Sequence, residues 1–473
     1  MEDNLKTLAS ALRGDLITRD QEEAYEAARF RGWNRELSFR THPLAFAIVS
    51  GVHDIVHVIN FCRENNIPLA VRGKGAHGPY GLVNDGITID LMKMDAVRVD
   101  PVKKIANIQA GANGGDVDHE NSLHNLACTV GAISHTGYGG VALAGGFGHM
   151  SRSIGTAVDQ AIEYEMVTYD GKVVRVNEAS DPELFWGMRG NGASFGIVTE
   201  FVVRLFDMPN NGIVYSGPII FSLENASEVI PEYLERLTRP GRKNTETLQM
   251  AIMAGPDGTF SLFVIPYFVG GTDAENKANA DEVAAFGSGS IVRQDGPVPF
   301  AAMGAAVDDA FPMNNNYWDS GVFIDWDPSD KNAVAAITDI IVKSWEERPE
   351  FLIPGSCLFF EEVGGATRDA DPTTTSFSGR SATLWAVDMS CWSNEGDQQA
   401  KAAAARKWSR SVVDKYQNYK VTGYSSGTFP TSDKEMLGIF TADAMTRLKA
   451  LKGKHDPNNM FKMSAWNYEA NAA

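Results

Sequence analysis

Residues 131–148 read GAISHTGYGGVALAGGFG and hold seven glycines in eighteen positions. Glycine lets a backbone turn sharply and approach a ligand or another backbone closely, so this density indicates a binding segment or a tightly packed corner. The stretch contains no Gly-Lys-Ser or Gly-Lys-Thr, and no GxGxxG is followed by a Rossmann crossover with an acid about twenty residues on. It therefore favours a nucleotide site that is neither a P-loop nor a Rossmann turn, with the packing corner as the alternative.

An earlier glycine-rich stretch, residues 71–80, here called the first glycine loop, reads VRGKGAHGPY and follows a strand-like segment. Its small residues allow backbone N–H groups to point at an anion, and Arg72 and Lys74 add positive charge in an acidic protein. A diphosphate is the ligand that suits such a loop. The alternative is a tight turn that carries a surface histidine, His77.

Length and composition indicate an ordinary globular protein. Its 473 residues exceed the roughly 250–300 at which one hydrophobic core stops growing, so we expect two packed units. The 42 Lys and Arg against 60 Asp and Glu give a net charge of -18, which repels phosphate backbones and anionic membranes. Neither nucleic acid nor a membrane is expected as a partner.

The cysteines and apolar runs bear on the cellular setting. The four cysteines lack metal-ligand spacing, so we expect no metal site and reduced, buried thiols at Cys62, Cys128, Cys357 and Cys391. No apolar run approaches the roughly 20 residues that cross a bilayer, and the N-terminus lacks a signal-peptide pattern. We expect a soluble intracellular protein; the sequon Asn225-Ala226-Ser227 keeps secretion open as the alternative.

The first half alternates short helical and strand patterns. Spacing of apolar residues predicts a helix over 54–66. Residues 161–177 predict a hairpin that turns at Asp170-Gly171. Ser180 is expected to cap the next helix, with Pro182 in its first turn.

The second half has longer alternating strands separated by amphipathic helices. Helices are predicted over 331–346 and 401–416, and a last one over about 442–452 that is ended by Gly453 and Asp456-Pro457. This pattern indicates an antiparallel sheet covered by helices. The fold class is therefore predicted as α+β.

The order of these segments resembles the berberine-bridge-enzyme-like branch of the vanillyl-alcohol-oxidase flavoproteins. The likeness rests on VRGKGAHGPYGLVNDGITIDL (71–91), NLACTVGAISHTGYGGVALAGGFGHMSR (125–152), DPELFWGMRGNGASFGIVTEFVVRLF (181–206) and KHDPNNMFK (454–462). It implies a PCMH-type FAD-binding domain over 1–208 with its core at about 40–206, a substrate domain over 209–422, and a C-terminal segment, 423–473, that returns to the FAD domain.

The resemblance also implies which residues hold FAD. The first glycine loop (71–80) and the second glycine-rich stretch (131–148) bind the diphosphate from two sides. A strand near Val198 contacts the cofactor, and an asparagine near the C-terminus reaches it. The positions so assigned are Arg72, Gly73, Lys74, Gly75, Ala76, His77, Gly78, Ser134, His135, Thr136, Gly137, Gly139, Gly140, Gly146, Gly196, Val198 and Asn467.

In the family the histidine of the first loop is commonly bonded to the flavin, which implies a covalent link through His77. Here one extra residue separates Arg72 from His77, so noncovalent FAD is the alternative. The cysteine that makes a second bond in some members falls at Ile133, so no cysteinyl link is expected. The position that admits or blocks oxygen falls at Thr136, which leaves oxidase and dehydrogenase open.

The resemblance places the catalytic base at Tyr424, about twenty-three residues before Arg447-Leu448, although Ser426 replaces the usual companion asparagine. A tyrosine with a purely structural role is the alternative. Glu361 and Glu362 are further proton acceptors, and on an alternating strand at least one should face water.

The expected activity is FAD-dependent oxidation. A small alcohol, phenolic or secondary-metabolite substrate gives hydride to flavin N5, and oxygen is the expected acceptor. A redox-silent cyclase or isomerase, a sugar oxidase and a flavin-storing protein remain alternatives, and the sequence leaves the oligomeric state open.

Overall fold

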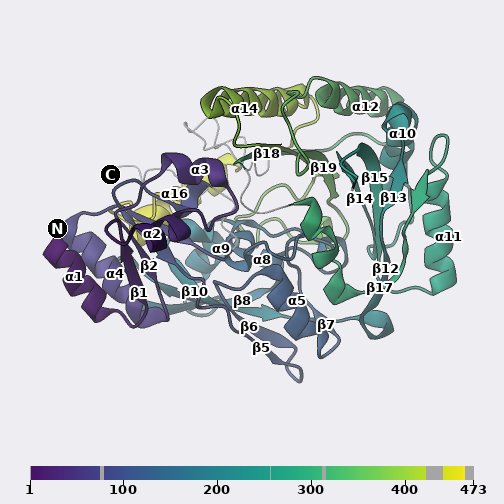
Figure 1. The fold of residues 1–473 in the computed structure, drawn as a ribbon. Helices are drawn as coiled ribbons and strands as arrows, with labels where there is room; N and C mark the ends of the chain where they lie inside the picture. The colour runs from purple at the N-terminus through teal and green to yellow at the C-terminus, as the bar shows by residue number, and fades with distance from the viewer. Residues whose placement is uncertain (1, 75–78, 256, 312–315, 422–439, 464–473) are drawn as a thin grey trace.

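The computed structural model describes residues 2–74, 79–255, 257–311, 316–421 and 440–463. The helices and strands form two lobes, and Figure 1 shows the N-terminal lobe with the last helix, α16, beside it and the later strands under α12 and α14. The two lobes contain both parallel and antiparallel strand pairs together with many helices. The α+β prediction is confirmed.

The N-terminal lobe begins with a small mixed sheet. Its strand order is β1 (Asp15–Thr18), β2 (Ala45–Ile48), β4 (Ile87–Asp90) and β3 (Leu69–Arg72), with β4 parallel to both β2 and β3. Helix α4 (Val52–Asn65) connects β2 to β3 and ends at Asn66 in the left-handed conformation, φ 52°. The helix predicted over 54–66 is confirmed, and α1 (Glu2–Ala11) packs beside it.

A five-stranded antiparallel sheet follows, and it carries the predicted hairpin. Its order is β5 (Val97–Asp100), β6 (Ile105–Gln109), β10 (Ile197–Arg204), β8 (Ala161–Val167) and β9 (Val173–Asn177). The turn between β8 and β9 has Gly171 at φ +79°, a conformation that glycine adopts without strain. The sequence signal was sufficient here because hairpin turns depend on local chemistry.

The N-terminal lobe also contains short helices. They are α2 (Glu22–Arg29), α3 (Arg35–Arg40), α5 (Gly114–Ser122), α6 (Tyr138–Ala144), α7 (Ser151–Ile154), α8 (Ala157–Gln160) and α9 (Pro182–Asn191). The cap predicted for α9 was wrong: Asp181, not Ser180, accepts the Leu184 N–H, at 3.0 Å. Ser180 instead donates to the Arg175 carbonyl at 3.0 Å, so it closes the turn before the helix.

The second lobe is built on a nine-stranded antiparallel sheet. Its main order is β16 (Val292–Arg293), β13 (Ile219–Phe221), β15 (Phe260–Phe268), β14 (Glu246–Ala254), β19 (Cys357–Glu362), β20 (Leu384–Trp392) and β18 (Asn316–Ile324); β12 (Ile213–Ser216) pairs with β15 and β17 (Gly296–Pro299). The two-stranded pair β7 (Leu126–Ala127) and β11 (Phe206–Asp207) lies before it in the chain.

One face of the large sheet packs against helices. The helix-side cluster joins α10 (Ala226–Leu237), α12 (Lys331–Glu346) and α14 (Gln398–Lys415) to the sheet, while α11 (Asp273–Ala284) packs near β12 and β15. Figure 1 shows α12 and α14 lying above the strands. The helix predicted over 331–346 is confirmed, as is the antiparallel sheet covered by helices. The other face of this sheet turns toward the N-terminal lobe.

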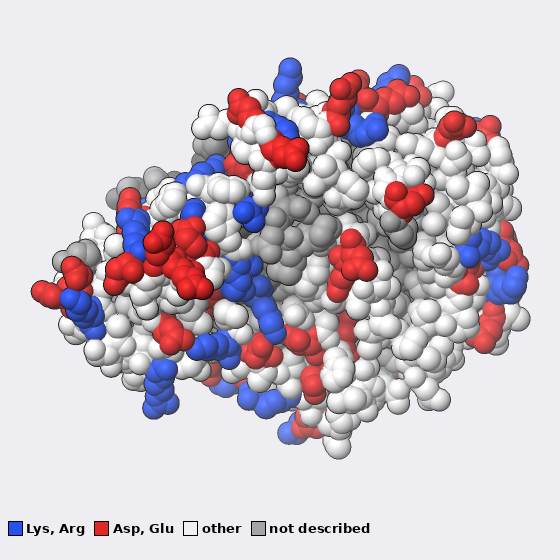
Figure 2. Space-filling model, viewed as in Figure 1, with Lys and Arg blue, Asp and Glu red and all other residues white. Residues whose placement is uncertain are grey.

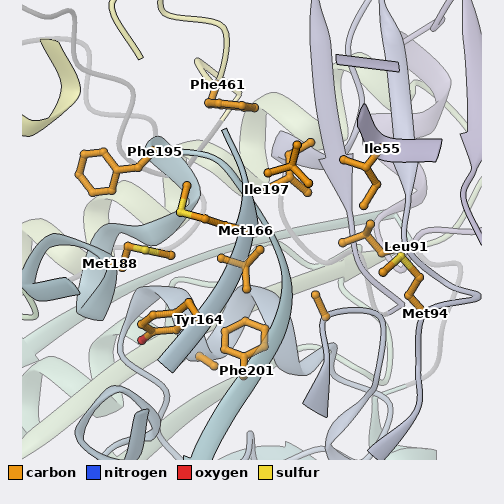
Figure 3. Close-up of a cluster of buried hydrophobic side chains, with 14 of the residues drawn as sticks. Ile55, Leu91, Met94, Tyr164, Met166, Met188, Phe195, Ile197, Phe201 and Phe461 are labelled. Carbon is orange, nitrogen blue, oxygen red and sulfur yellow. The ribbon is translucent and has the colours of Figure 1, made fainter. Parts of the chain in front are cut away.

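The last described helix, α16 (Ala442–His455), packs on the N-terminal lobe. Leu448, Leu451 and Phe461 belong to its buried core, and Figure 3 shows Phe461 beside Met166 and Ile197. The helix passes Gly453, the first predicted end signal, and continues to His455, so that Asp456 of the second signal is its C-cap.

A buried ion pair ties the end of α16 to the lobe. Lys452 Nζ lies 2.7 Å from Asp456 and 2.8 Å from the Ser194 carbonyl. Asp456 in turn accepts the Phe461 N–H at 2.8 Å. These charge-assisted bonds hold the chain beyond the helix against the core.

Two large cores separate the lobes, one built from residues 5–205 and 440–461 and one from 215–416. We propose that the predicted boundary at 208/209 follows this separation; the boundary at 422/423 lies outside the described residues. The four cysteines are free and buried, as expected. In the part of the chain that the structure describes, no helix is long and apolar enough to span a bilayer, and no His, Cys, Asp and Glu cluster suits a metal.

Candidate functional site

The second glycine-rich stretch, residues 131–148, lies where the two lobes meet. His149 stacks on Tyr267 of β15, with ring centroids 4.1 Å apart. Phe147 lies 6.2 Å from the Trp385 ring of β20. Arg152 of α7 pairs with Glu362 of β19 at 3.0 Å. The stretch therefore faces the large sheet on its helix-free side.

Several of its glycines are required by close packing. A Cβ on Gly139 would lie 2.6 Å from the Ala110 carbonyl oxygen, and one on Gly146, at φ +84°, would collide with Ala157. Gly196, just before β10, has the same restriction, because a Cβ there would lie 2.1 Å from the Met166 side chain. At these positions no larger residue fits, so packing alone explains the glycine whether or not the backbone also binds a ligand.

Gly140 differs from its neighbour. No atom lies within 4 Å of the position a Cβ would take, and the residue is exposed. Val141, Leu143 and Ala144 on the same helix, α6, are half-exposed, whereas Tyr138 and Ala142 are buried. Helix α6 thus turns one side into the core and leaves an open, apolar side with a glycine at its edge.

The sheet presents a matching surface on β14, β18, β19 and β20. Side chains two residues apart on a strand share a face, and register places Glu361 beside Trp385 and Asp319 beside Met389. The half-exposed members of this face are Met253, Asp319, Phe359, Trp385 and Met389. The half-exposed part of this sheet face is therefore mostly apolar, with Asp319 as its charged member, and such a surface suits a cofactor or substrate site.

Figure 2 shows the charges of the visible side. Acidic and basic side chains alternate around broad uncharged areas, without a continuous basic stripe on that side. This distribution agrees with the net charge of -18 and offers no surface for a nucleic acid backbone there.

In the first glycine loop, both predicted positive charges already have acidic partners. Arg72 is 2% exposed and pairs with Asp90 at 2.6 Å; desolvation lowers the pKa of its guanidinium. Lys74 lies 2.9 Å from Asp95 and 3.0 Å from Asp116. Both charges therefore help to hold the loop in place. Gly75, Ala76, His77 and Gly78 lie outside the described residues.

Arg31 is a residue that the sequence did not reveal. Its guanidinium donates to the carbonyls of Gly73 at 3.2 Å and Lys74 at 2.9 Å, and pairs with Asp90 at 2.6 Å. Arg31 thereby fixes the backbone that leads into the histidine loop. Its partners lie more than forty residues away in sequence, so no local pattern could have indicated it.

The residues from Ser134 to Gly137 are held from two sides. Ser134 donates through its N–H, at 3.1 Å, and its hydroxyl, at 2.5 Å, to Asp308. His135 Nε2 donates to the Phe311 carbonyl at 3.1 Å, and the Thr136 carbonyl accepts the Gly114 N–H at 2.9 Å. Gly137 then forms the cap of α6. The segment is rigidly placed between the two lobes.

Of the remaining predicted positions, the structure describes Val198 and Gly73. Val198 is 3% exposed on β10, beside Met166 of β8. Gly73 is half-buried, with a Cβ position 3.4 Å from the Ala110 carbonyl oxygen. Tyr424 and Asn467 lie outside the described residues.

Two titratable side chains are buried between the lobes, His149 after the glycine-rich stretch and Glu361 on β19. His149 is 4% exposed; its Nε2 donates to the Ala132 carbonyl at 3.1 Å, and burial lowers the pKa of the ring to about 4. Glu361 is 3% exposed, and burial raises the pKa of its carboxyl to about 8. At neutral pH the histidine is uncharged and the carboxyl is mostly protonated.

The expectation that Glu361 or Glu362 faces water was wrong. Glu362 is 2% exposed and is matched by Arg152 at 3.0 Å and Arg242 at 2.5 Å. Alternation along a strand predicts a wet face only where that face is uncovered. Here helices cover one face of the sheet, and the N-terminal lobe covers much of the other.

Comparison with known proteins agrees with this architecture. Residues 43–177 match the FAD binding domain family model. An FAD-linked oxidoreductase of Dictyostelium discoideum is 28% identical over 453 residues, covering 94% of this chain and 93% of that protein.

Two solved structures have the same fold. The 6-hydroxy-D-nicotine oxidase from Arthrobacter nicotinovorans superposes with a TM-score of 0.82 at 21% identity, covering 97% of this chain and 98% of that one. The berberine-bridge-enzyme-like protein 1 of Physcomitrella patens gives 0.84 at 17% identity, covering 99% and 100%. Residues 43–177 thus match the FAD binding domain family, and the chain as a whole has the fold of the 6-hydroxy-D-nicotine oxidase and berberine-bridge-enzyme-like structures.

Proposed function

We propose that the protein oxidises a small organic substrate with FAD bound between the second glycine-rich stretch and the large sheet. The observations that carry this proposal are the open apolar side of α6 next to Gly140 and the half-exposed Phe359, Trp385 and Met389 on the large sheet. A flat aromatic ring system fits two facing apolar surfaces, and the FAD binding domain match includes this helix.

When bound, FAD supplies the acceptor for two electrons and a hydrogen from the substrate carbon. The chain supplies position: Arg31 and the pairs of Arg72 and Lys74 hold the first loop, and Asp308 and Phe311 hold Ser134 and His135. Covered apolar walls exclude water from the reacting carbon. The product leaves as a carbonyl, imine or quinone methide once a base has taken the matching proton.

His77 is proposed as the covalent attachment point of the flavin, without a second link through cysteine. The proposal rests on the family pattern around residues 71–91, and on Ile133 standing at the cysteinyl position. Cys128 is buried and accepts a hydrogen bond from Asn121 at 3.4 Å, which suits a structural thiol. Acid precipitation tests the bond: yellow colour should stay with the protein pellet, and His77→Ala should release it.

Tyr424 is proposed as the base that takes the substrate proton. Tyrosine has a pKa near 10 in water, so this role requires nearby positive charge or hydrogen-bond donors. Tyr424→Phe should slow anaerobic flavin reduction by about 10²–10⁴-fold while FAD content is unchanged. An unchanged reduction rate would move the role to another residue.

Oxygen is proposed as the electron acceptor, with Thr136 beside its path. The substrate class proposed is a small alcohol, phenolic compound or secondary metabolite. Anaerobic mixing followed by exposure to air separates the possibilities: bleaching by substrate and rapid recovery with hydrogen peroxide supports an oxidase. Turnover without any bleaching would support a redox-silent reaction instead.

A further inference from the structure

Glu361 occupies an unusual position on the sheet. It lies on β19 in the row that includes Trp385, and Gln249 of β14 donates to it at 3.3 Å. Phe359, two residues earlier on β19, shares its face. Both Trp385 and Phe359 are half-exposed, so the buried Glu361 has two partly accessible aromatic neighbours on its face of the sheet.

Glu361 has no basic partner among the residues that the structure describes. The contrast with the next residue is direct, since Glu362 is matched by two arginines, Arg152 and Arg242. Among the described residues, the hydrogen-bond partner of the Glu361 carboxyl is the neutral amide of Gln249. A buried carboxyl without a cation is costly to ionise, which agrees with the raised pKa of about 8.

We propose that the sheet surface around Glu361 binds a protonated amine, with the Glu361 carboxylate as its counter-ion and Trp385 and Phe359 against its apolar body. This inference names the substrate class and rests on the proposed function. A carboxylate flanked by aromatic rings is the environment that suits an ammonium group, because the rings attract a cation through their faces. The net charge of -18 also favours the approach of a cationic molecule over an anionic one.

Binding of an amine at Glu361 should release a proton, and this release can be measured without any turnover. Before binding, Glu361 carries its proton at pH 7; when an ammonium binds, the carboxyl loses that proton to solvent. A titratable group near it is Tyr267 on β15, and burial raises the pKa of its phenol. Glu362 is held by its arginines, so Glu361 is the group that can release the proton near neutral pH.

The test is calorimetry on the FAD-loaded protein with benzylamine, phenethylamine and 4-phenylbutylamine, each beside the matching neutral alcohol. Titrations at pH 7 in phosphate and in Tris count the protons, because the two buffers differ in ionisation enthalpy. At least one amine should release close to one proton on binding, and the alcohols none. Failure of all three amines to bind, or binding without proton release, would overturn the inference.

The variant is Glu361→Gln, with Asp388→Asn as a matched control. Asp388 is also a fully buried carboxyl with a raised pKa, but it contacts Ser320 and Ser409 on the helix side of the same sheet. Glu361→Gln should weaken amine binding about 10- to 100-fold and abolish proton release, while Asp388→Asn should change neither. Equal losses in both variants would indicate a general effect on the sheet and contradict the inference.

Two further measurements, FAD content and melting temperature, check that the variants fold and separate the amine site from the proposed oxidation. Glu361→Gln removes a buried ionisable group, so its melting temperature should not fall. If FAD is absent or never reduced while amines still bind with proton release, the proposed oxidation fails and the amine site stands. If FAD is reduced by an alcohol and amines do not bind, the amine site fails and the oxidation stands.

Discussion

Arg380 and Asp159 join the two lobes through a two-pronged ion pair, with Arg380 Nη1 and Nη2 at 2.9 Å and 2.5 Å from the two carboxylate oxygens. Arg380 precedes β20 and is 4% exposed, and Asp159 belongs to α8. The same carboxylate also accepts the Thr156 N–H at 2.9 Å. The pair therefore connects the large sheet to the segment that follows the glycine-rich stretch.

Removing Arg380 should destabilise the protein markedly. Arg380→Ala leaves Asp159 largely buried without its cation, and we expect a loss of about 3 kcal/mol in the free energy of unfolding, measured by urea denaturation. Lys343→Ala is the control, because its pair with Asp339 is exposed at 61% and 69% and should contribute below about 0.5 kcal/mol. A loss no larger than that of the control would show that the lobes do not depend on the pair.

The neighbours Gly139 and Gly140 should respond oppositely to alanine. Gly139→Ala places a Cβ 2.6 Å from the Ala110 carbonyl oxygen and should destabilise the apoprotein by about 1–3 kcal/mol. Gly140→Ala has open space and should leave apoprotein stability unchanged or raise it by up to about 1 kcal/mol. If FAD occupies the open side of α6, Gly140→Ala should nevertheless weaken FAD binding, measured by equilibrium titration of apoprotein. Normal FAD affinity in Gly140→Ala would place the cofactor elsewhere.

Arg31 should matter for cofactor loading more than for folding. Arg31→Lys keeps the charge but loses the planar fork that reaches two carbonyls and Asp90, so we expect FAD content to fall several-fold. Arg19→Lys serves as control, since Arg19 is half-exposed and binds Asp85 and the His42 and Pro43 carbonyls, away from the loop. Absorbance at 450 nm against protein absorbance gives the measurement. Equal FAD content in both variants would show that Arg31 has no particular role in cofactor binding.

Asp388 should make stability depend on pH. Burial raises the pKa of its carboxyl to about 7 from an ordinary value of 3.8, so the folded state binds a proton that the unfolded state has lost. Its contribution is fully present below about pH 4, declines as pH rises, and is lost above about pH 7. Asp388→Asn should therefore gain roughly 2–4 kcal/mol relative to wild type at pH 8 and little at pH 4, measured by urea denaturation at each pH. A pH-independent difference would contradict this origin.

Local chemistry accounts for what the sequence predicted well. The hairpin at 161–177 and the helix over 331–346 depend on turn residues and apolar spacing within a few positions of each other. The cap of α9 was misplaced by one residue because Ser180 and Asp181 are both good caps, and only the turn geometry selects Asp181.

The site depends on longer-range contacts, which explains what the sequence missed. Arg31 meets Asp90 across 59 residues, and Glu361 meets Gln249 across 112. The burial of both glutamates follows from how the lobes cover the sheet, and a single strand pattern carries no information on that. The glycine-rich stretch was recognisable because a dense run of glycines is visible without knowing the partners.

The return of α16 to the first lobe has a consequence for biosynthesis. Leu448, Leu451 and Phe461 complete a core whose other members come from residues 5–205. During translation, the N-terminal half leaves the ribosome long before these side chains exist, and the second lobe is synthesised in between. The FAD half can therefore reach its final packing only near the end of synthesis, so the nascent chain should acquire its cofactor after release rather than during elongation.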